Sequence, residues 1–229
     1  MNLTQGKLLN GKLLNGINMY AVNAFLPAFL MRTHLMGLKE ATNASSIVLG
    51  AVGVIGLLGG GWAADRLSRT RRDGKLLLSS ITMIIAAPCI YFALKQPPGA
   101  TVGFMLLMGT GSMLMFVYYS CVYAAIQDVI EPALRGTAMA LYFFAMYVLG
   151  ASLGPIGTGM LSDHFAKKAM AAAGATTMTE QFKATGLHSA MYVIPLLCAL
   201  LAVVLFAASR TVSADMEKLR KWLREQAAE

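Results

Sequence analysis

Long apolar runs alternate with short polar links along the whole chain. A helix needs about 20 mostly apolar residues to cross a membrane, and six runs are long enough. We place these predicted spans at residues 13–31, 46–64, 75–94, 101–127, 136–161 and 187–208. The pattern predicts an all-α membrane protein whose six transmembrane helices occupy residues 13–210. A polar segment is expected at residues 1–12 and a cytoplasmic amphipathic tail at residues 211–229.

Glycine lines one face of the second predicted span. Gly50, Gly53, Gly56 and Gly60 recur at intervals of three or four residues, so they fall on one side of a helix. Small residues let helices approach closely inside a membrane, where no water drives them together. We therefore expect another helix to pack tightly on this face. The short turn at residues 66–74 predicts that the second and third spans are neighbours.

Prolines and links predict local irregularities. Pro27 and Pro155 each remove a backbone donor from a span, so the helices are expected to bend there. Residues 166–173 are compatible with a short helix lying on the membrane. In the tail, an apolar stripe that includes Met216 and Trp222 runs among basic residues, which predicts either an amphipathic helix at the interface or a solvated one.

Composition and charge agree with a membrane protein. Hydrophobic residues make up 57% of the chain and charged residues only 13%, whereas about a quarter of a soluble domain is charged. The net charge of +8 does not predict a nucleic-acid partner, because the basic residues lie in short links between apolar runs. About two thirds of the 19 lysines and arginines, Lys12 among them, fall on the side of the N-terminus. This excess predicts that both termini face the cytoplasm, and the membrane expected is a bacterial inner membrane.

The sequence contains no recognisable catalytic set. His34, His164 and His188 lie in or beside outer loops, apart from cysteines and paired carboxylates. The cysteines lack metal-ligand spacing, and the carboxylates stand at the ends of spans rather than inside them. We therefore predict neither an enzyme nor a metal or cofactor, and no proton relay through this chain alone.

Three stretches resemble the major facilitator superfamily. The end of the second span resembles the signature loop of that family through Gly61, Asp65, Arg66, Arg69 and Arg71, although Ser68 stands where the family usually has glycine. The fifth span looks like the eleventh helix of the family, with a helix-bend motif of Gly150, Gly154, Pro155 and Gly159. Residues 26–32 look like the seventh helix of its spinster-type branch.

The resemblance implies half of a twelve-helix secondary transporter. Such a half contains two inverted repeats of three helices, and the substrate lies near the midplane between two halves. It further implies that Asp65 and the arginines act as a gate. Residues expected to line the substrate cavity are Tyr20, Asn23, Ser112, Met115, Tyr119, Phe143 and Tyr147. They carry no formal charge, which suits an amphipathic or lipid-like small molecule.

Simpler interpretations remain open at this stage. The cavity residues are equally compatible with packing between helices, and the arginines with setting topology alone. The partners expected are the lipid bilayer, a small-molecule substrate, and either an N-terminal transporter half or a second copy of this chain. A self-sufficient homodimeric transporter and a non-catalytic membrane scaffold are the alternatives to a transporter half.

Overall fold

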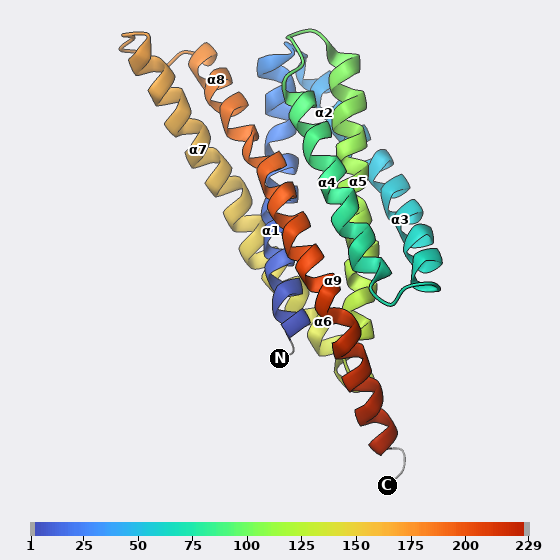
Figure 1. Ribbon diagram of the computed structural model, residues 1–229. Coiled ribbons are helices and arrows are strands. Elements are labelled where there is room, and N and C mark those ends of the chain that lie inside the picture. The colour runs from blue at the N-terminus through green and yellow to red at the C-terminus, as the bar shows by residue number, and fades with distance from the viewer. Residues whose placement is uncertain (1–2, 227–229) are drawn as a thin grey trace.

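The computed structural model describes residues 3–226, and these residues form a bundle of long helices without any strand (Figure 1). Six stretches within this range are long and apolar enough to cross a membrane, as the sequence predicts. They are Thr4–Thr33, Leu38–Ser68, Gly74–Leu94, Thr101–Asp128, Pro132–Ala172 and Glu180–Gln226. The two ends of the chain lie toward the same end of the bundle (Figure 1).

The first helix starts earlier than the hydropathy pattern predicts. Helix α1 is Leu3–Thr33, so residues 3–12, expected as a polar segment before the first span, form its first turns, and residues 1–2 lie outside the described residues. The start of α1 is held by the last helix of the bundle: the Thr4 amide donates to Oδ2 of Asp215 at 3.2 Å, and the Thr4 hydroxyl bonds that of Thr211 at 2.9 Å. A carboxylate that accepts from a free helix N–H stabilises the first turn.

The first three spans contain one short irregular segment. After α1 come α2 (Leu38–Ser46), the π-helical segment η1 (Ile47–Ala51), α3 (Val52–Ser68) and α4 (Gly74–Leu94). Helix α1 runs through Pro27 as one element. Helix α3 packs mainly on α5 (Thr101–Asp128) and touches α4 less, so the expected close pairing of the second and third spans is a minor contact.

The second three spans also contain short irregular segments. They comprise α5, the 3-10 turn η2 (Pro132–Leu134), α6 (Arg135–Phe144), the π-helical segment η3 (Ala145–Gly150), α7 (Ala151–Ala172), α8 (Glu180–Met191) and α9 (Val193–Gln226). The irregularity expected at Pro155 lies just before it, in η3. Residues 166–172 continue α7, so a separate helix at 166–173 is wrong.

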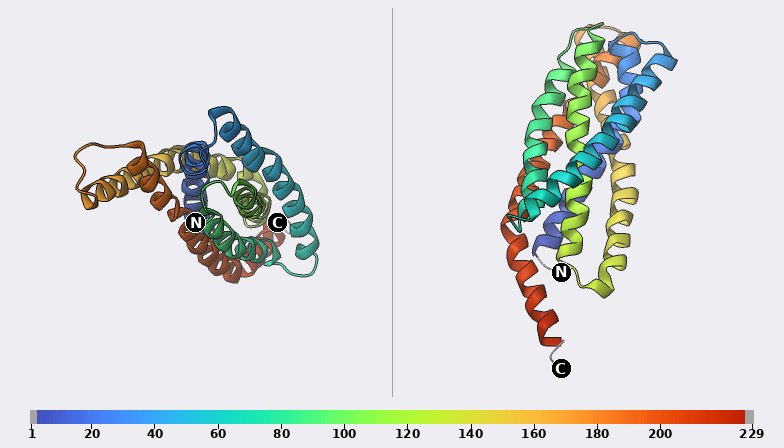
Figure 2. Two further views of the ribbon diagram at one scale, coloured as in Figure 1. Left: turned by 90° about the horizontal axis from the view of Figure 1, so that it is seen from above. Right: turned by 90° about the vertical axis from the view of Figure 1, so that its right-hand side faces the viewer.

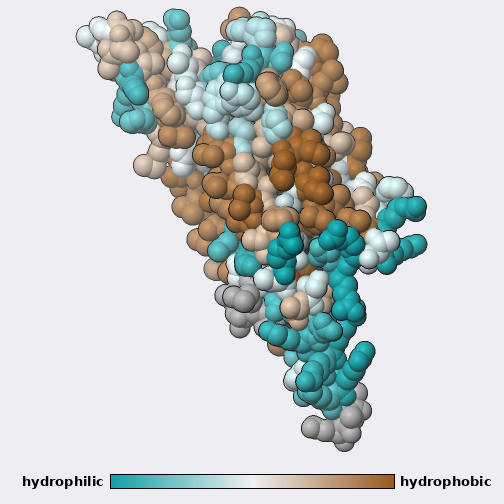
Figure 3. Space-filling view, in the orientation of Figure 1, coloured by the Kyte–Doolittle hydropathy of each residue, from teal (hydrophilic) through white to brown (hydrophobic). Residues whose placement is uncertain are grey.

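The tail is part of the last span. Helix α9 continues without a break to Gln226 and projects beyond the bundle (Figure 1). The expected amphipathic tail at 211–229 is therefore the end of α9, and residues 227–229 lie outside the described residues. Its surface is hydrophilic, whereas a hydrophobic band covers the middle of the bundle on the face drawn in Figure 3.

The glycine face of α3 brings two helices close together, as predicted, except at Gly50, which lies in η1 with nothing within 4 Å of its Cβ position. Gly53, Gly56 and Gly60 are buried against α5, and a Cβ on Gly60 would lie 2.9 Å from Cα of Val117. The hydroxyl of Ser120 donates to the carbonyl of Leu57 at 2.7 Å across this contact. Helix α5 buries one face inside the bundle, with Met108 and Tyr118 fully buried, while Val102 and Leu106 on another face stay exposed (Figure 2, right).

Candidate functional site

A continuous row of aromatic rings joins α1, α5, α6 and η3; we call it the aromatic wall. Neighbouring ring centroids are 5.5 Å apart for Tyr119 and Tyr123, 5.3 Å for Tyr123 and Phe143, and 6.3 Å for Phe143 and Tyr147. Tyr20 completes the row with an edge contact to Tyr147 at 6.3 Å. These separations are typical of favourable aromatic pairs.

Local spacing explains why the rings align. Tyr119 and Tyr123 are four residues apart on α5 and share one face. Phe143 and Tyr147 lie at the same spacing where α6 passes into η3. The wall is therefore built from rings on one side of two helices, and α1 supplies its remaining member.

Glycines set the position of α1 against the wall. Gly150 and Gly154 of the helix-bend motif are buried against α1, and a Cβ on Gly150 would lie 2.9 Å from Cα of Gly16. A Cβ on Gly154 would overlap the backbone of Ile17. In the same motif, Pro155 lies inside α7 and Gly159 stands near Phe25. This close approach is what lets Tyr20 reach Tyr147.

The structure brings together four of the seven residues predicted to line a cavity: Tyr20, Tyr119, Phe143 and Tyr147. Asn23 is exposed one turn beyond Tyr20, and its side-chain amide donates to the carbonyl of Met19 at 3.0 Å. Ser112 and Met115 are buried inside the bundle on α5. Their role in binding stays a prediction.

Lys12 is the residue of this region that sequence reasoning missed. Its side chain is 0% exposed, and its Nζ donates to the Tyr123 hydroxyl at 2.7 Å. The same nitrogen lies 4.4 Å from the ring centroid of Tyr123, 4.5 Å from Tyr142, 5.1 Å from Tyr119 and 5.3 Å from Phe143. A cation within about 6 Å of a ring face is attracted by it. The four rings thus form a cage around the ammonium.

The predicted gate residues lie at the end of α3. Asp65, Arg66 and Arg69 are exposed there, and Gly61 is half-buried beside α5. Arg71 pairs with Asp73 in the turn, with 3.1 Å between Nη2 and Oδ2. Within residues 3–226, the ion pairs do not include Asp65.

Comparison with known proteins identifies the family. A sequence model of the Major Facilitator Superfamily matches residues 3–155. The chain is 37% identical over 150 residues to an MFS-type efflux pump of Mycolicibacterium smegmatis, covering 63% of this chain and 33% of that protein. It is 30% identical over 125 residues to the probable sphingolipid transporter spinster homolog 3 of Arabidopsis thaliana, covering 52% and 24%.

A solved structure shares the fold. The bacterial homolog of the human lysosomal transporter Spinster, in an inward-facing and unoccupied conformation, superposes with a TM-score of 0.81 at 22% identity. The match covers 93% of this chain and 48% of that one, so the six helices have the fold of half such a protein. The chain spans at most about a third of the length of the curated relatives that it matches. Its sequence and its fold agree, and the chain belongs to the Major Facilitator Superfamily.

Proposed function

We propose that this chain is one six-helix half of a secondary transporter that moves an amphipathic small molecule by alternating access. The substrate would lie between the aromatic wall and a second half, and the two halves would rock around it. The observation that carries the proposal is the uneven burial of the six spans.

Two spans are much less buried than the others. Only 28% of the most apolar window in Leu38–Ser68 and 22% of that in Pro132–Ala172 are buried inside the bundle, against 44–50% for the other four. Large apolar side chains stand exposed on both, including Leu58 and Trp62 on α3 and Leu153 and Met160 on α7. These surfaces are available to a second six-helix half, and the length of the matched Spinster homolog supports such a partner.

The chemistry of the wall favours an amphipathic substrate. Aromatic rings offer apolar area, and the hydroxyls of Tyr20, Tyr119 and Tyr147 offer hydrogen bonds at its edge. One relative is described as a probable sphingolipid transporter and another as an efflux pump. A sphingolipid has an apolar body and a polar end, whereas the description of the efflux pump names no substrate.

The orientation and the gate complete the proposal. The termini lie toward one end of the bundle, and the basic turn after α3 is rich in arginine, so we assign this end to the cytoplasm. Lys12 is buried inside the bundle, and leaving it out of the count of basic residues on that side does not reverse the excess. Asp65 would then hold the positive end of a helix in the second half.

Photo-crosslinking tests the partner half directly. A benzophenone amino acid is placed at Leu58 on α3 or Leu153 on α7, and at Val203 on α9 as a matched exposed apolar control. We expect the first two positions to cross-link to a membrane protein of about six spans and Val203 to cross-link only to lipid. Cross-links between copies of this chain would support the homodimeric transporter instead. Lipid adducts at all three positions would refute the proposal.

A further inference from the structure

Lys12 carries a buried charge that the described chain does not neutralise. Within residues 3–226, the ion pairs include no acidic partner for Lys12. A lysine ammonium has three donors, and the hydrogen bond seen for it is the one to the Tyr123 hydroxyl. Charged groups inside a membrane protein are costly and usually mark a ligand or ion site.

The cage gives this charge only part of what it needs. Ring faces attract the ammonium. The cage consists of three tyrosines and one phenylalanine, however, and none of them bears a formal negative charge. Tyr123 and Phe143 are only half-buried, so they separate Lys12 from the outer surface of the wall by a single layer of rings. Movement of the Tyr123 ring would let another acceptor take the place of its hydroxyl.

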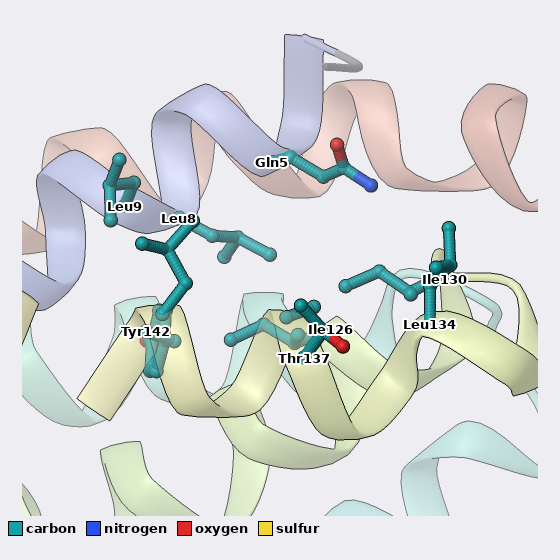
Figure 4. Close-up of a pocket in the computed structure, with 10 residues that line it drawn as sticks. Gln5, Leu8, Leu9, Ile126, Ile130, Leu134, Thr137 and Tyr142 are labelled. Carbon is teal, nitrogen blue, oxygen red and sulfur yellow. The ribbon is translucent and has the colours of Figure 1, made fainter. Parts of the chain in front are cut away.

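An apolar crevice begins on the other side of Tyr142. It has a volume of about 310 Å³ and lies between the first turns of α1 and the start of α6 (Figure 4). Leu8 and Leu9 line it from α1, and Ile126 and Leu141 from α5 and α6. Leu8 is one helical turn before Lys12, so the crevice and the cage adjoin along α1. A short alkyl chain fits the shape and polarity of this crevice.

We propose that Lys12 is the specificity-determining residue of the site and receives the headgroup of an amphiphile that has one anionic group and one alkyl chain. The alkyl chain would occupy the crevice, while the anionic group would bond the ammonium in place of Tyr123. This inference rests on the proposed function, because it names the charge of the substrate that the wall admits. It also implies that the wall disfavours organic cations, which the ammonium would repel.

The test compares probes that differ in charge or in chain. Binding of tritium-labelled laurate and of tritium-labelled dodecanol is measured on the purified full chain by scintillation proximity at about neutral pH, where laurate is ionised. Unlabelled acetate and dodecylammonium serve as competitors: one has the carboxylate without the chain, the other the chain with a positive charge. The variants are Lys12→Met, which keeps the length of the side chain, and the control Lys7→Met. Lys7 lies on the same helix and donates to the Ala207 carbonyl, so its loss removes the same charge elsewhere.

We expect laurate to bind the native chain and Lys7→Met more tightly than dodecanol does. Loss of a charge-assisted hydrogen bond should weaken laurate binding to Lys12→Met by about 10- to 150-fold. Dodecanol affinity should change by less than about threefold, since it makes no such bond. Acetate and dodecylammonium should both compete poorly with laurate.

The outcomes separate this inference from the function on which it rests. Lys12 does not select an anion if dodecanol and laurate bind the native chain with equal affinity. The same conclusion follows if Lys7→Met and Lys12→Met weaken laurate binding equally. In both cases the wall still binds amphiphiles. Tighter binding of dodecylammonium than of laurate would also overturn the inference. If neither laurate nor dodecanol binds the native chain, the proposal of an amphipathic substrate is refuted together with the role of Lys12. Retention of dodecanol binding by Lys12→Met shows that this variant is folded.

Discussion

The contact between α3 and α5 makes a sharp prediction about stability. Gly56 faces α5, and a Cβ at this position would overlap the carbonyl oxygen of Met113. Gly59 lies on the same helix, but nothing stands within 4 Å of the place where its Cβ would be. The variants Gly56→Ala and Gly59→Ala therefore add the same methyl group to the same helix, one inside the contact and one outside it.

The magnitude follows from the geometry. Overpacking a close contact costs about 1–3 kcal/mol. Separating the helices also stretches the bond from the Ser120 hydroxyl to the Leu57 carbonyl, 2.7 Å long, which contributes about 1 kcal/mol. Replacing glycine by alanine inside a helix raises the stability of both variants by about 1 kcal/mol, so this contribution cancels in the comparison. Gly56→Ala should thus be less stable than Gly59→Ala by about 2–4 kcal/mol.

Trp62 provides the signal for this measurement. It lies on α3 itself, so in a Trp222→Phe background its fluorescence should report the unfolding of α3. Both variants are unfolded by sodium dodecyl sulfate in mixed micelles, and their free energies of unfolding are compared. Equal stability of the two variants would mean that α3 and α5 are not in the close contact described here, and the account of the glycine face would be wrong.

Three further predictions concern the ends of the bundle. Asp215→Ala removes the acceptor of the Thr4 amide and should lower stability by about 0.5–2 kcal/mol, with faster hydrogen exchange in the first turn of α1. Burial and the nearby His188 hold the pKa of His34 below its ordinary value. The unfolded chain therefore binds more protons at this position, so stability should fall as the pH drops below about 6.5, and His34→Phe should reduce that loss of melting temperature. Asp65→Asn should slow the transport cycle of the assembled protein while laurate affinity stays within about threefold of the native value.

Each of these predictions has its own control and failing result. Glu217→Ala, on the exposed surface of α9, should leave the hydrogen exchange of α1 unchanged; if it matches Asp215→Ala, the cap is not specific. The exposed His164 of α7 serves as the histidine control, and an unaltered pH dependence of melting in His34→Phe would exclude His34 as its source. Unchanged transport by Asp65→Asn would remove the gate role.

Hydropathy predicts the fold well because the spans are strongly apolar. The six crossings and the glycine contact of α3 follow from spacing alone, since Gly53, Gly56 and Gly60 repeat along one face. The ends of the helices are harder to predict. Helix α1 extends to Leu3 because Asp215, distant in sequence, caps it, and such a long-range bond leaves no local pattern. The tail is separated from the last span in the prediction for another reason: the chain turns polar after Arg210, although α9 continues through it.

The candidate site was predicted in part. The resemblance to the family singles out Tyr119, Phe143 and Tyr147 as cavity residues, and their rings lie together in the wall, although their role in binding stays a prediction. Lys12 was counted among the charges that set topology, because the segment around it is polar on average. Its periodicity held a signal: Thr4, Leu8, Lys12 and Asn15 recur at three or four residues and are all buried. The burial of a lysine among tyrosines depends on helices far apart in sequence, so the mean hydropathy of one segment does not predict it.

Access to the wall from both sides of the membrane tests the central claim most directly. Tyr147 and Asn23 are replaced singly by cysteine in a chain whose Cys89, Cys121 and Cys198 have been changed to alanine, with Val203→Cys on α9 as a control that faces outward. A membrane-impermeant maleimide is then applied to right-side-out and to inside-out vesicles that contain the chain with its partner half. We predict that Tyr147→Cys and Asn23→Cys are labelled in both kinds of vesicle, because the wall opens to each side in turn, and that Val203→Cys is labelled in neither. Labelling of Tyr147→Cys in the wall and of Asn23→Cys beside it from one side only, or from neither side, would contradict alternating access at this wall.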